Sequence, residues 1–216
     1  MCFSKEISFI ASGLLAIAGA YSIGIVAKRR QWRFIFFASI PLLFAAQQFC
    51  EGFVYSSINE NNLDWTRNFS FAYLFFAFFF WPFWTPLSLY FIEKDRRFIF
   101  SMFTLYGITI AIGLFIFYLS KGTLISTTVI NKSLCYSTNP SAPHEIAFIF
   151  YLLATIGPLC FSSRVMIKIL GVLTALSAMI SYFISQATFV SVWCFFTALI
   201  SVFIIFITYR ETELSI

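Results

Sequence analysis

The sequence has little charge and almost no histidine. Only 11% of its 216 residues are charged, against about a quarter in a typical soluble domain, and there is one histidine. A single histidine excludes a three-histidine zinc site of the kind that seven-span ceramidase-like hydrolases use. Every lysine lies at the end of a hydrophobic segment or in a connector, so none is available for a retinal Schiff base. Rhodopsin-like photoreceptors, and retinal as a cofactor, are therefore excluded.

Several motifs of well-known protein classes are also missing. The chain has no Walker A sequence, no G-x-S-x-G and no H-E-x-x-H, which excludes a P-loop, a nucleophile elbow and a zincin site. Its five cysteines form no C-x-x-C pair, so neither a zinc ribbon nor a thioredoxin-like motif is present. No cationic residue falls in the middle of a hydrophobic segment, which excludes a voltage sensor. No inverted repeat is evident, which disfavours a standard secondary transporter.

Apolar residues are abundant instead. They make up 60% of the chain, and 31 of them are phenylalanine. A membrane-spanning helix needs about 20 apolar residues, and seven segments qualify. We therefore predict one all-α transmembrane domain over residues 1–216, a bundle of seven helices. The predicted spans are residues 7–27, 34–57, 69–92, 98–119, 145–161, 165–185 and 187–208. Only Ser185–Ala187 separates the last two, so a re-entrant pair with five other spans is the alternative.

The basic residues are unevenly distributed between the two sides of these spans. Ten of the 14 fall on one side: Lys28, Arg29, Arg30, Arg33, Lys94, Arg96, Arg97, Arg164, Lys168 and Arg210. The other four, on the opposite side, are Lys5, Arg67, Lys121 and Lys132. Short cytoplasmic connectors carry an excess of lysine and arginine. We therefore predict a cytoplasmic C-terminus and an outer N-terminus. In this arrangement the net charge of +5 does not indicate nucleic acid as a partner, and membrane lipids are the expected surroundings.

The longest non-membrane segment is the fourth connector, residues 120–143, on the predicted outer side. Residues 123–130 are rich in β-branched side chains, Asn131 and Lys132 are typical of a turn, and residues 133–136 could return as a second strand. The pattern predicts a short β-hairpin, or an ordered lid over the outer mouth of the bundle. The alternative is a flexible surface loop.

One polar cluster lies inside a predicted span. Gln47, Gln48 and Glu51 share neighbouring parts of one helical face, because they are three and four residues apart, and Cys50 borders them. A charged residue at the centre of a spanning helix costs about 2.5–3.5 kcal/mol on insertion scales. Glu51 must therefore face the interior of the bundle, be protonated or be paired. The cluster indicates a site for a ligand, proton or metal ion, and the alternative is a hydrogen-bonded clamp between helices.

Possible partners of Glu51 lie on the same side of the membrane. Cys2, His144 and Glu51 together could bind a transition-metal ion, although nothing in their spacing demands it. The alternative for His144 is a residue that starts a helix at the membrane interface. Cys2 and Cys135 could instead form a disulfide in an oxidising compartment.

The third span contains two prolines, Pro82 and Pro86, near the middle of the membrane. Each lacks a backbone donor, so a kink is expected, and the freed carbonyl groups could line a cavity. Trp81 and Trp84 lie deeper than an interfacial belt would place them. They either wall an internal pocket or serve as packing.

Two short stretches carry a resemblance. They are MCFS with Ser8-Phe9 at the start, and PLLFA from Pro41 running into Gln47-Gln48 and Glu51-Gly52. In about the first 55 residues the chain resembles a family of bacterial multi-span membrane proteins that has no established activity, and beyond them it is similar by hydropathy only. The resemblance implies a location in the bacterial inner membrane. It also suggests that Cys2, Ser4, Gln47, Gln48 and Glu51 form one set near the outer face.

Three functions are compatible with these observations. The first is binding or transport of a small cation, metal ion or polar molecule through an outer-facing pocket around Glu51, with Gln47 and Gln48 as neutral ligands. The second is a membrane-embedded enzyme that acts on a lipid or quinone, with Glu51 as acid or base and Cys2 as nucleophile. The third is a non-catalytic scaffold or accessory subunit. The sequence specifies neither the ligand nor the oligomeric state.

Overall fold

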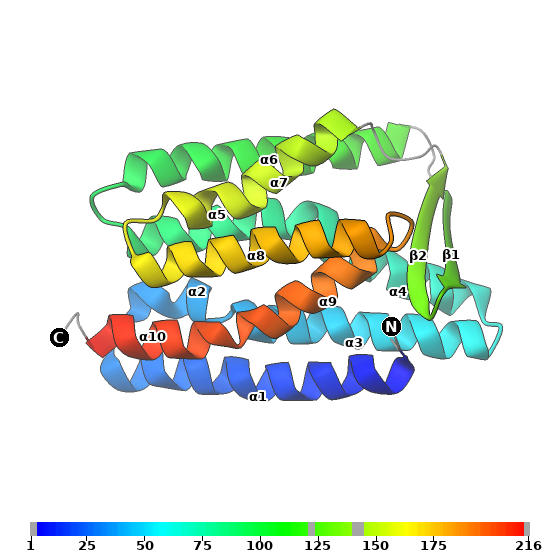
Figure 1. Cartoon of the computed structure of the whole chain (residues 1–216), viewed down its shortest axis with the longest axis horizontal. Helices are drawn as coiled ribbons and strands as arrows, with labels where there is room; N and C mark the ends of the chain where they lie inside the picture. The colour runs from blue at the N-terminus through cyan, green and yellow to red at the C-terminus, as the bar shows by residue number, and fades with distance from the viewer. Residues whose placement is uncertain (1–3, 121–123, 140–144, 214–216) are drawn as a thin grey trace.

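The protein is a bundle of long helices with a β-hairpin across one end (Figure 1). The computed structural model describes residues 4–120, 124–139 and 145–213. Within these residues, six helical segments are long and apolar enough to cross a membrane: Lys5–Arg29, Trp32–Asn59, Leu63–Ile92, Arg97–Ile116, Val165–Ile184 and Phe189–Glu213. Phe148–Phe161 is a shorter apolar helix. The prediction of an all-α transmembrane fold is therefore confirmed, whereas the crossing of the membrane by the shorter helix stays a prediction.

The first two passes form a tight antiparallel pair. Helix α1 (Lys5–Arg29) packs along α3 (Ile40–Asn59), after a connection through η1 (Trp32–Phe34) and α2 (Ile35–Ala38). Two glycines allow this approach. A Cβ atom added at Gly19 would lie 2.5 Å from the backbone nitrogen of Leu42, and one at Gly52 would lie 2.8 Å from the ring of Phe9. Small residues let helix backbones come close together in a membrane, where packing replaces the hydrophobic effect between helices.

The third pass is made of α4 (Leu63–Leu74), the π-helical segment η2 (Phe75–Phe80) and α5 (Trp81–Ile92). It begins six residues before the predicted start at 69, because the side chain of Asn62 caps the helix by accepting a hydrogen bond from the backbone nitrogen of Trp65 (3.1 Å). The π-helical turn immediately precedes Pro82. Such turns occur as local irregularities inside helices, often where a hydrogen bond of the regular ladder cannot form.

The two prolines of α5 leave two carbonyl groups without their helical hydrogen bonds, and neighbouring helices contact these groups. Pro82 cannot donate to Ala77 in the π-helical register, and the carbonyl of Ala77 accepts a hydrogen bond from the Tyr151 hydroxyl. Pro86 likewise cannot donate to the carbonyl of Pro82. That carbonyl faces Gly107 of α6 (Arg97–Ser120), where an added Cβ atom would lie 1.8 Å from the Pro82 oxygen. The third and fourth passes are therefore in backbone contact.

The predicted hairpin is present. Strand β1 (Leu124–Ile130) pairs antiparallel with β2 (Ser133–Asn139), and Asn131 and Lys132 form the turn with positive φ angles of 49° and 64°. The hairpin is held to the bundle by hydrogen bonds: the Tyr55 hydroxyl donates to the carbonyl of Lys132 (3.1 Å). Ser70 and Thr127 share a second one, between their hydroxyl groups (2.7 Å). The segment is thus an ordered cap on the bundle.

The remaining helices complete the bundle. Helix α7 (Glu145–Phe161) is followed by α8 (Val165–Ile184), and α9 (Phe189–Ser201) continues into α10 (Phe203–Glu213). The short break at residues 185–188 separates two helical segments that are each long enough to cross a membrane. This favours two full passes there over the re-entrant pair.

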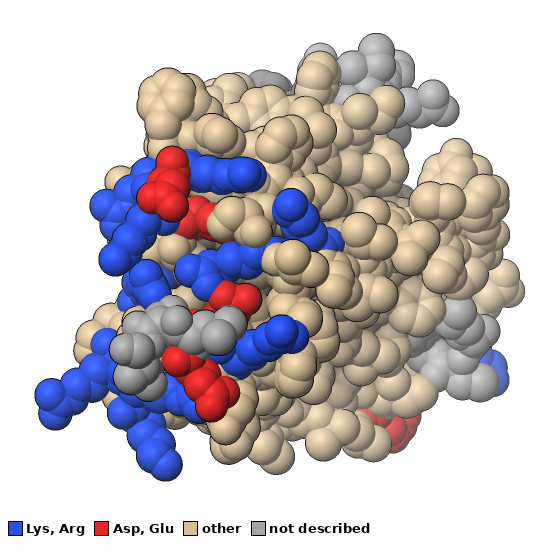
Figure 2. Space-filling model, turned by 60° about the vertical axis from the view of Figure 1, so that its left-hand side comes forward, with Lys and Arg blue, Asp and Glu red and all other residues tan. Residues whose placement is uncertain are grey.

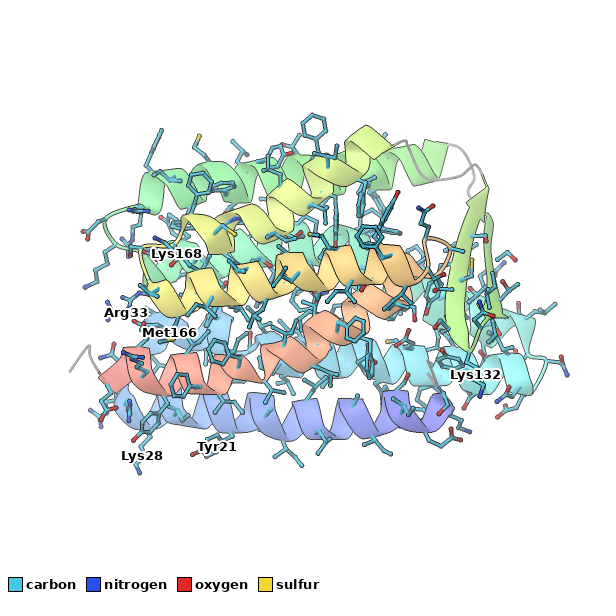
Figure 3. All side chains as sticks on the ribbon, in the orientation of Figure 1. Tyr21, Lys28, Arg33, Lys132, Met166 and Lys168 are labelled. Atoms are coloured by element: carbon cyan, nitrogen blue, oxygen red, sulfur yellow. The ribbon has the colours of Figure 1, made fainter. Side chains whose placement is uncertain are left out.

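The two ends of the bundle differ in charge. The connectors before η1, after α5 and after α7, together with the end of α10, lie at the end opposite the hairpin (Figure 1). We call this the basic end, because the ten basic residues counted above belong to it; Figure 2 shows them gathered there. Lys28, Arg33 and Lys168 lie at this end in Figure 3, and Lys132 at the hairpin end.

Hydrogen bonds tie the connectors of the basic end together. Glu93, which follows α5, is 4% exposed, and its carboxylate accepts hydrogen bonds from the hydroxyl groups of Ser162 and Ser163 and from the backbone nitrogen of Ser163 (2.9 Å). Arg164, the next residue, forms a salt bridge with Glu211 of α10. The connector between α7 and α8 is therefore joined to both α5 and α10.

Candidate functional site

The polar cluster predicted in the second span is buried. Gln47 and Gln48 of α3 are fully buried, and Glu51 is 2% exposed. Helical spacing places the three side chains on one face of α3, and that face points into the bundle because α1 and α9 pack against the helix. The cluster lies in the half of the bundle nearer the hairpin.

Glu51 is bonded to a residue far away in the sequence. The hydroxyl of Ser191, in α9, donates to Glu51 Oε1 over 2.5 Å. The Gln48 side chain also lies close enough to interact with the carboxylate, but neither its nitrogen nor its oxygen has a hydrogen bond of good geometry. In the residues that the structure describes, no lysine, arginine or histidine forms an ion pair with Glu51.

Gln47 joins the cluster to the third pass. Its Oε1 accepts a hydrogen bond from Trp81 Nε1 (2.8 Å), and its Nε2, which is buried, has no partner of good geometry. The Cys194 thiol, one helical turn along α9 from Ser191, lies beside the Gln47 amide. Polar atoms of the cluster are thus buried without complete hydrogen bonding, which costs about 1–3 kcal/mol for each such group.

Three tyrosines lie on the hairpin side of the cluster, and one of them, Tyr136, belongs to strand β2. The rings of Tyr73 and Tyr136 are stacked, with centroids 4.9 Å apart, and Tyr55 lies next to them on α3. Burial, followed by the proximity of Glu51, raises the pKa of the Tyr136 hydroxyl well above its usual value. The hydroxyl therefore stays protonated, and its oxygen has no hydrogen-bond partner in the described residues. Glu51 consequently has aromatic rings on its hairpin side.

A pocket begins on the other side of the cluster. It has a volume of about 60 Å³ and lies between five helical passes. The residues that line it are Ile40, Phe44, Trp81, Thr85, Tyr151, Thr155, Leu159, Leu170, Thr174, Trp193, Cys194, Thr197, Ser201 and Ile204. Trp81 and Cys194 belong both to this wall and to the surroundings of Gln47. The expectation that Trp81 walls an internal pocket is therefore confirmed.

Comparison with known proteins assigns the chain to a family. The model of DUF6629, described as a family of unknown function, matches residues 1–215. The chain belongs to DUF6629. Comparisons with curated proteins and with solved structures gave no match. A family without an established activity thus covers the whole chain, as expected in part from about the first 55 residues. The bacterial family suggested by the two short motifs, and the motifs themselves, remain untested.

The structure of this DUF6629 protein places some, but not all, of the predicted site residues. Ser4 is the N-cap of α1 and accepts a hydrogen bond from the backbone nitrogen of Ile7 (3.4 Å). Cys2 and His144 lie outside the described residues, so the proposed metal site and the disulfide with Cys135 stay predictions. Among residues 4–120, 124–139 and 145–213, no group of three or more histidine, cysteine or acidic side chains could hold a metal ion.

The sequence did not predict which residues from other segments lie near Glu51 in this DUF6629 protein. Ser191 is one of several small polar residues in an apolar segment, and such residues are common in membrane helices. Tyr73 and Tyr136 come from α4 and from the hairpin. No spacing rule connects positions so far apart in the sequence. Only the packing of α4, the hairpin and α9 around α3 brings them together.

Proposed function

We propose that this DUF6629 protein binds a small cation in the hairpin half of the bundle, with Glu51 as its charged ligand and Gln48 as a neutral one. The observation that carries the proposal is the buried carboxylate, which no cationic side chain in the described part of the chain neutralises. An uncompensated buried charge is strongly unfavourable. A bound cation removes this cost and explains why the residue can remain within an apolar bundle.

The neighbouring groups suit a cation better than an anion. Gln48 Oε1 and the Tyr136 hydroxyl oxygen, both near Glu51, are acceptors without a hydrogen-bond donor of good geometry in the described residues. The stacked rings of Tyr73 and Tyr136 add the negative faces of two aromatic systems. Anions would instead meet a carboxylate in a medium of low dielectric constant, where repulsion between like charges is strong.

The Glu51→Gln variant tests the proposal. The purified protein is heated in the presence of sodium, magnesium, manganese or methylammonium chloride, and unfolding is followed by tryptophan fluorescence. We expect at least one of these cations to raise the Tm of the wild type, because ligand at about 100 times its Kd stabilises by about 2.7 kcal/mol. The same cation should leave the Tm of Glu51→Gln unchanged.

Glu60→Gln is the matched control, because Glu60 follows the same helix but is exposed. It should respond to the cation as the wild type does. The proposal is wrong if none of the four cations raises the Tm of the wild type, or if Glu51→Gln responds equally well.

We also propose that the hairpin end faces outward, with the chain in a bacterial inner membrane and its C-terminus in the cytoplasm. The gathering of ten basic residues at the opposite end supports this orientation (Figure 2), since cytoplasmic connectors are rich in lysine and arginine. In this orientation, Glu51 is reached from the outer side, past the hairpin.

Cysteine labelling in intact cells tests the orientation. Asp64→Cys places a thiol at the start of α4, near the hairpin, and Lys94→Cys places one in the connector after α5. Both positions are exposed. A membrane-impermeant maleimide should label the first variant and not the second, above the background of the native cysteines, and cell lysis should make both reactive. The reverse pattern would invert the proposed topology.

A further inference from the structure

The pocket described above begins about one helical turn from the Glu51 cluster and extends toward the basic end. On α9, Ser191 contacts Glu51, the next turn contributes Cys194, and the following turns contribute Thr197 and Ser201 to the pocket wall. On α3, Glu51 and Gln47 are followed, in the same direction, by the wall residues Phe44 and Ile40. From Trp193 to Ile204 the wall extends about 16 Å along α9 and α10. Glu51 is not part of this wall, and the end of the wall nearest to it is formed by Trp81 and Cys194.

Four of the six hydroxyl groups in the pocket wall donate hydrogen bonds to backbone carbonyl groups. Thr155, Thr174 and Ser201 donate to carbonyl groups of their own helices, over 3.0, 2.9 and 2.6 Å. Tyr151 donates to the carbonyl of Ala77. Hydroxyl groups that are bonded in this way leave mainly methyl groups and carbon atoms facing the cavity, and apolar cavities stay dry and take apolar ligands.

One buried polar atom of the wall lacks a hydrogen-bond partner in the described residues, the Thr197 hydroxyl oxygen halfway along the pocket. Gln47 Nε2 also lacks a partner; Gln47 does not line the cavity, but its amide lies beside Cys194, which does. The charged group, Glu51, lies beyond this end of the pocket, and the wall consists mainly of apolar side chains. A charged group beyond one end of an apolar cavity is the arrangement that an amphiphilic ligand requires.

From this juxtaposition we propose that the cation bound at Glu51 is a primary amine with a short apolar tail, and that the tail lies in the pocket. The inference rests on the proposed function, because Glu51 is the ligand of the charged head. An ammonium group has three donors, which match the oxygen atoms of Glu51, Gln48 and Tyr136. The pocket of about 60 Å³ has room for about five methylene-sized groups.

Hexylamine, methylamine and hexanol separate the contributions of head and tail. Hexylamine and methylamine share the ammonium head group, and hexylamine and hexanol share the six-carbon tail. For the wild type we expect hexylamine to raise the Tm at a concentration at least about tenfold lower than methylamine, because each buried methylene group improves affinity about fourfold relative to water. Hexanol should raise the Tm little, since an alcohol cannot neutralise the Glu51 carboxylate.

Thr197→Trp fills the pocket, and Leu199→Trp places the same side chain on the exposed face of the same helix, where Leu199 is 46% exposed. In Thr197→Trp, hexylamine should lose its advantage over methylamine, whereas Leu199→Trp should keep it. The methylamine response shows that the variant is folded with an intact head site. If that response is lost, the smaller replacement Thr197→Leu takes the place of the first variant.

The outcomes distinguish the two proposals. If methylamine acts through Glu51 but chain length or Thr197→Trp has no influence, the tail assignment is wrong and the proposed function stands. If hexylamine and hexanol act equally, and act equally on Glu51→Gln, then the pocket takes apolar molecules without a charged head and the amine proposal is wrong, whereas the proposed function is decided by the four small cations above.

Discussion

Gly107→Ala should destabilise the protein by about 2–3 kcal/mol, which is the cost of inserting a group into a packed interior without space for it. The added Cβ atom would lie 1.8 Å from the carbonyl oxygen of Pro82 and 2.6 Å from its carbonyl carbon. Both are backbone atoms, so no side chain can rotate to make room. The two helices would have to separate, which would disturb the packing of the third and fourth passes. Thermal unfolding of the purified protein, followed by tryptophan fluorescence, measures the loss.

Gly113→Ala is the control for this substitution. Gly113 lies on the same helix, and a Cβ atom added there meets nothing within 4 Å. Because alanine is a better helix former than glycine by about 1 kcal/mol, this variant should be as stable as the wild type or more so. Equal stability of the two alanine variants would show that α5 and α6 are not in backbone contact at Gly107.

Glu93→Ala should destabilise the basic end by about 2–3 kcal/mol. The substitution removes the acceptor of three hydrogen bonds from Ser162 and Ser163, and hydrogen bonds to charged groups contribute about 1.5–3 kcal/mol each. The connector is near water, which can satisfy part of what is lost, so the three contributions do not add fully. We expect a lower Tm and, in addition, faster proteolysis of the connector between α7 and α8.

Two further variants define the origin of this effect. Asp95→Ala removes an exposed carboxylate from the same connector and should change the stability by less than about 0.5 kcal/mol. Glu93→Gln keeps one oxygen acceptor and should fall between the wild type and Glu93→Ala. A Tm of Glu93→Ala equal to that of Asp95→Ala would contradict the proposed role of Glu93 in holding the connectors together.

Hydropathy and local propensity were sufficient for the architecture. The long apolar segments became helices because a chain in lipid must satisfy its backbone polar groups internally. The β-branched run before Asn131 became a strand, since its turn residues accept positive φ angles. Helix α4 starts six residues before the predicted span at 69, because the Asn62 cap extends the helix through the polar residues 63–68. The π-helical turn has no sequence signal apart from the proline that follows it.

The candidate site was predictable on α3 and nowhere else. Glu51 is conspicuous because a carboxylate within an apolar segment is costly, and helical spacing adds Gln47 and Gln48. Its partner Ser191 is 140 residues away in the sequence. Glu93 was overlooked because a carboxylate at the end of a span is ordinary, and its burial arises only from the connector after α7 that folds over it. Contacts between passes depend on how the helices pack, which neither composition nor periodicity contains.

The two glycine contacts between α1 and α3 also fix how far one helix can slide along the other. Phe9 meets Gly52 and Gly19 meets Leu42, so ten residues separate the two contacts on each helix, which corresponds to about 15 Å. Because both contacts belong to the same antiparallel register, a shift by one turn would put a larger residue at each close approach at once. The position of Glu51 along α1 is therefore fixed, and a movement that admits a ligand has to come from elements outside this pair, such as α9 or the hairpin.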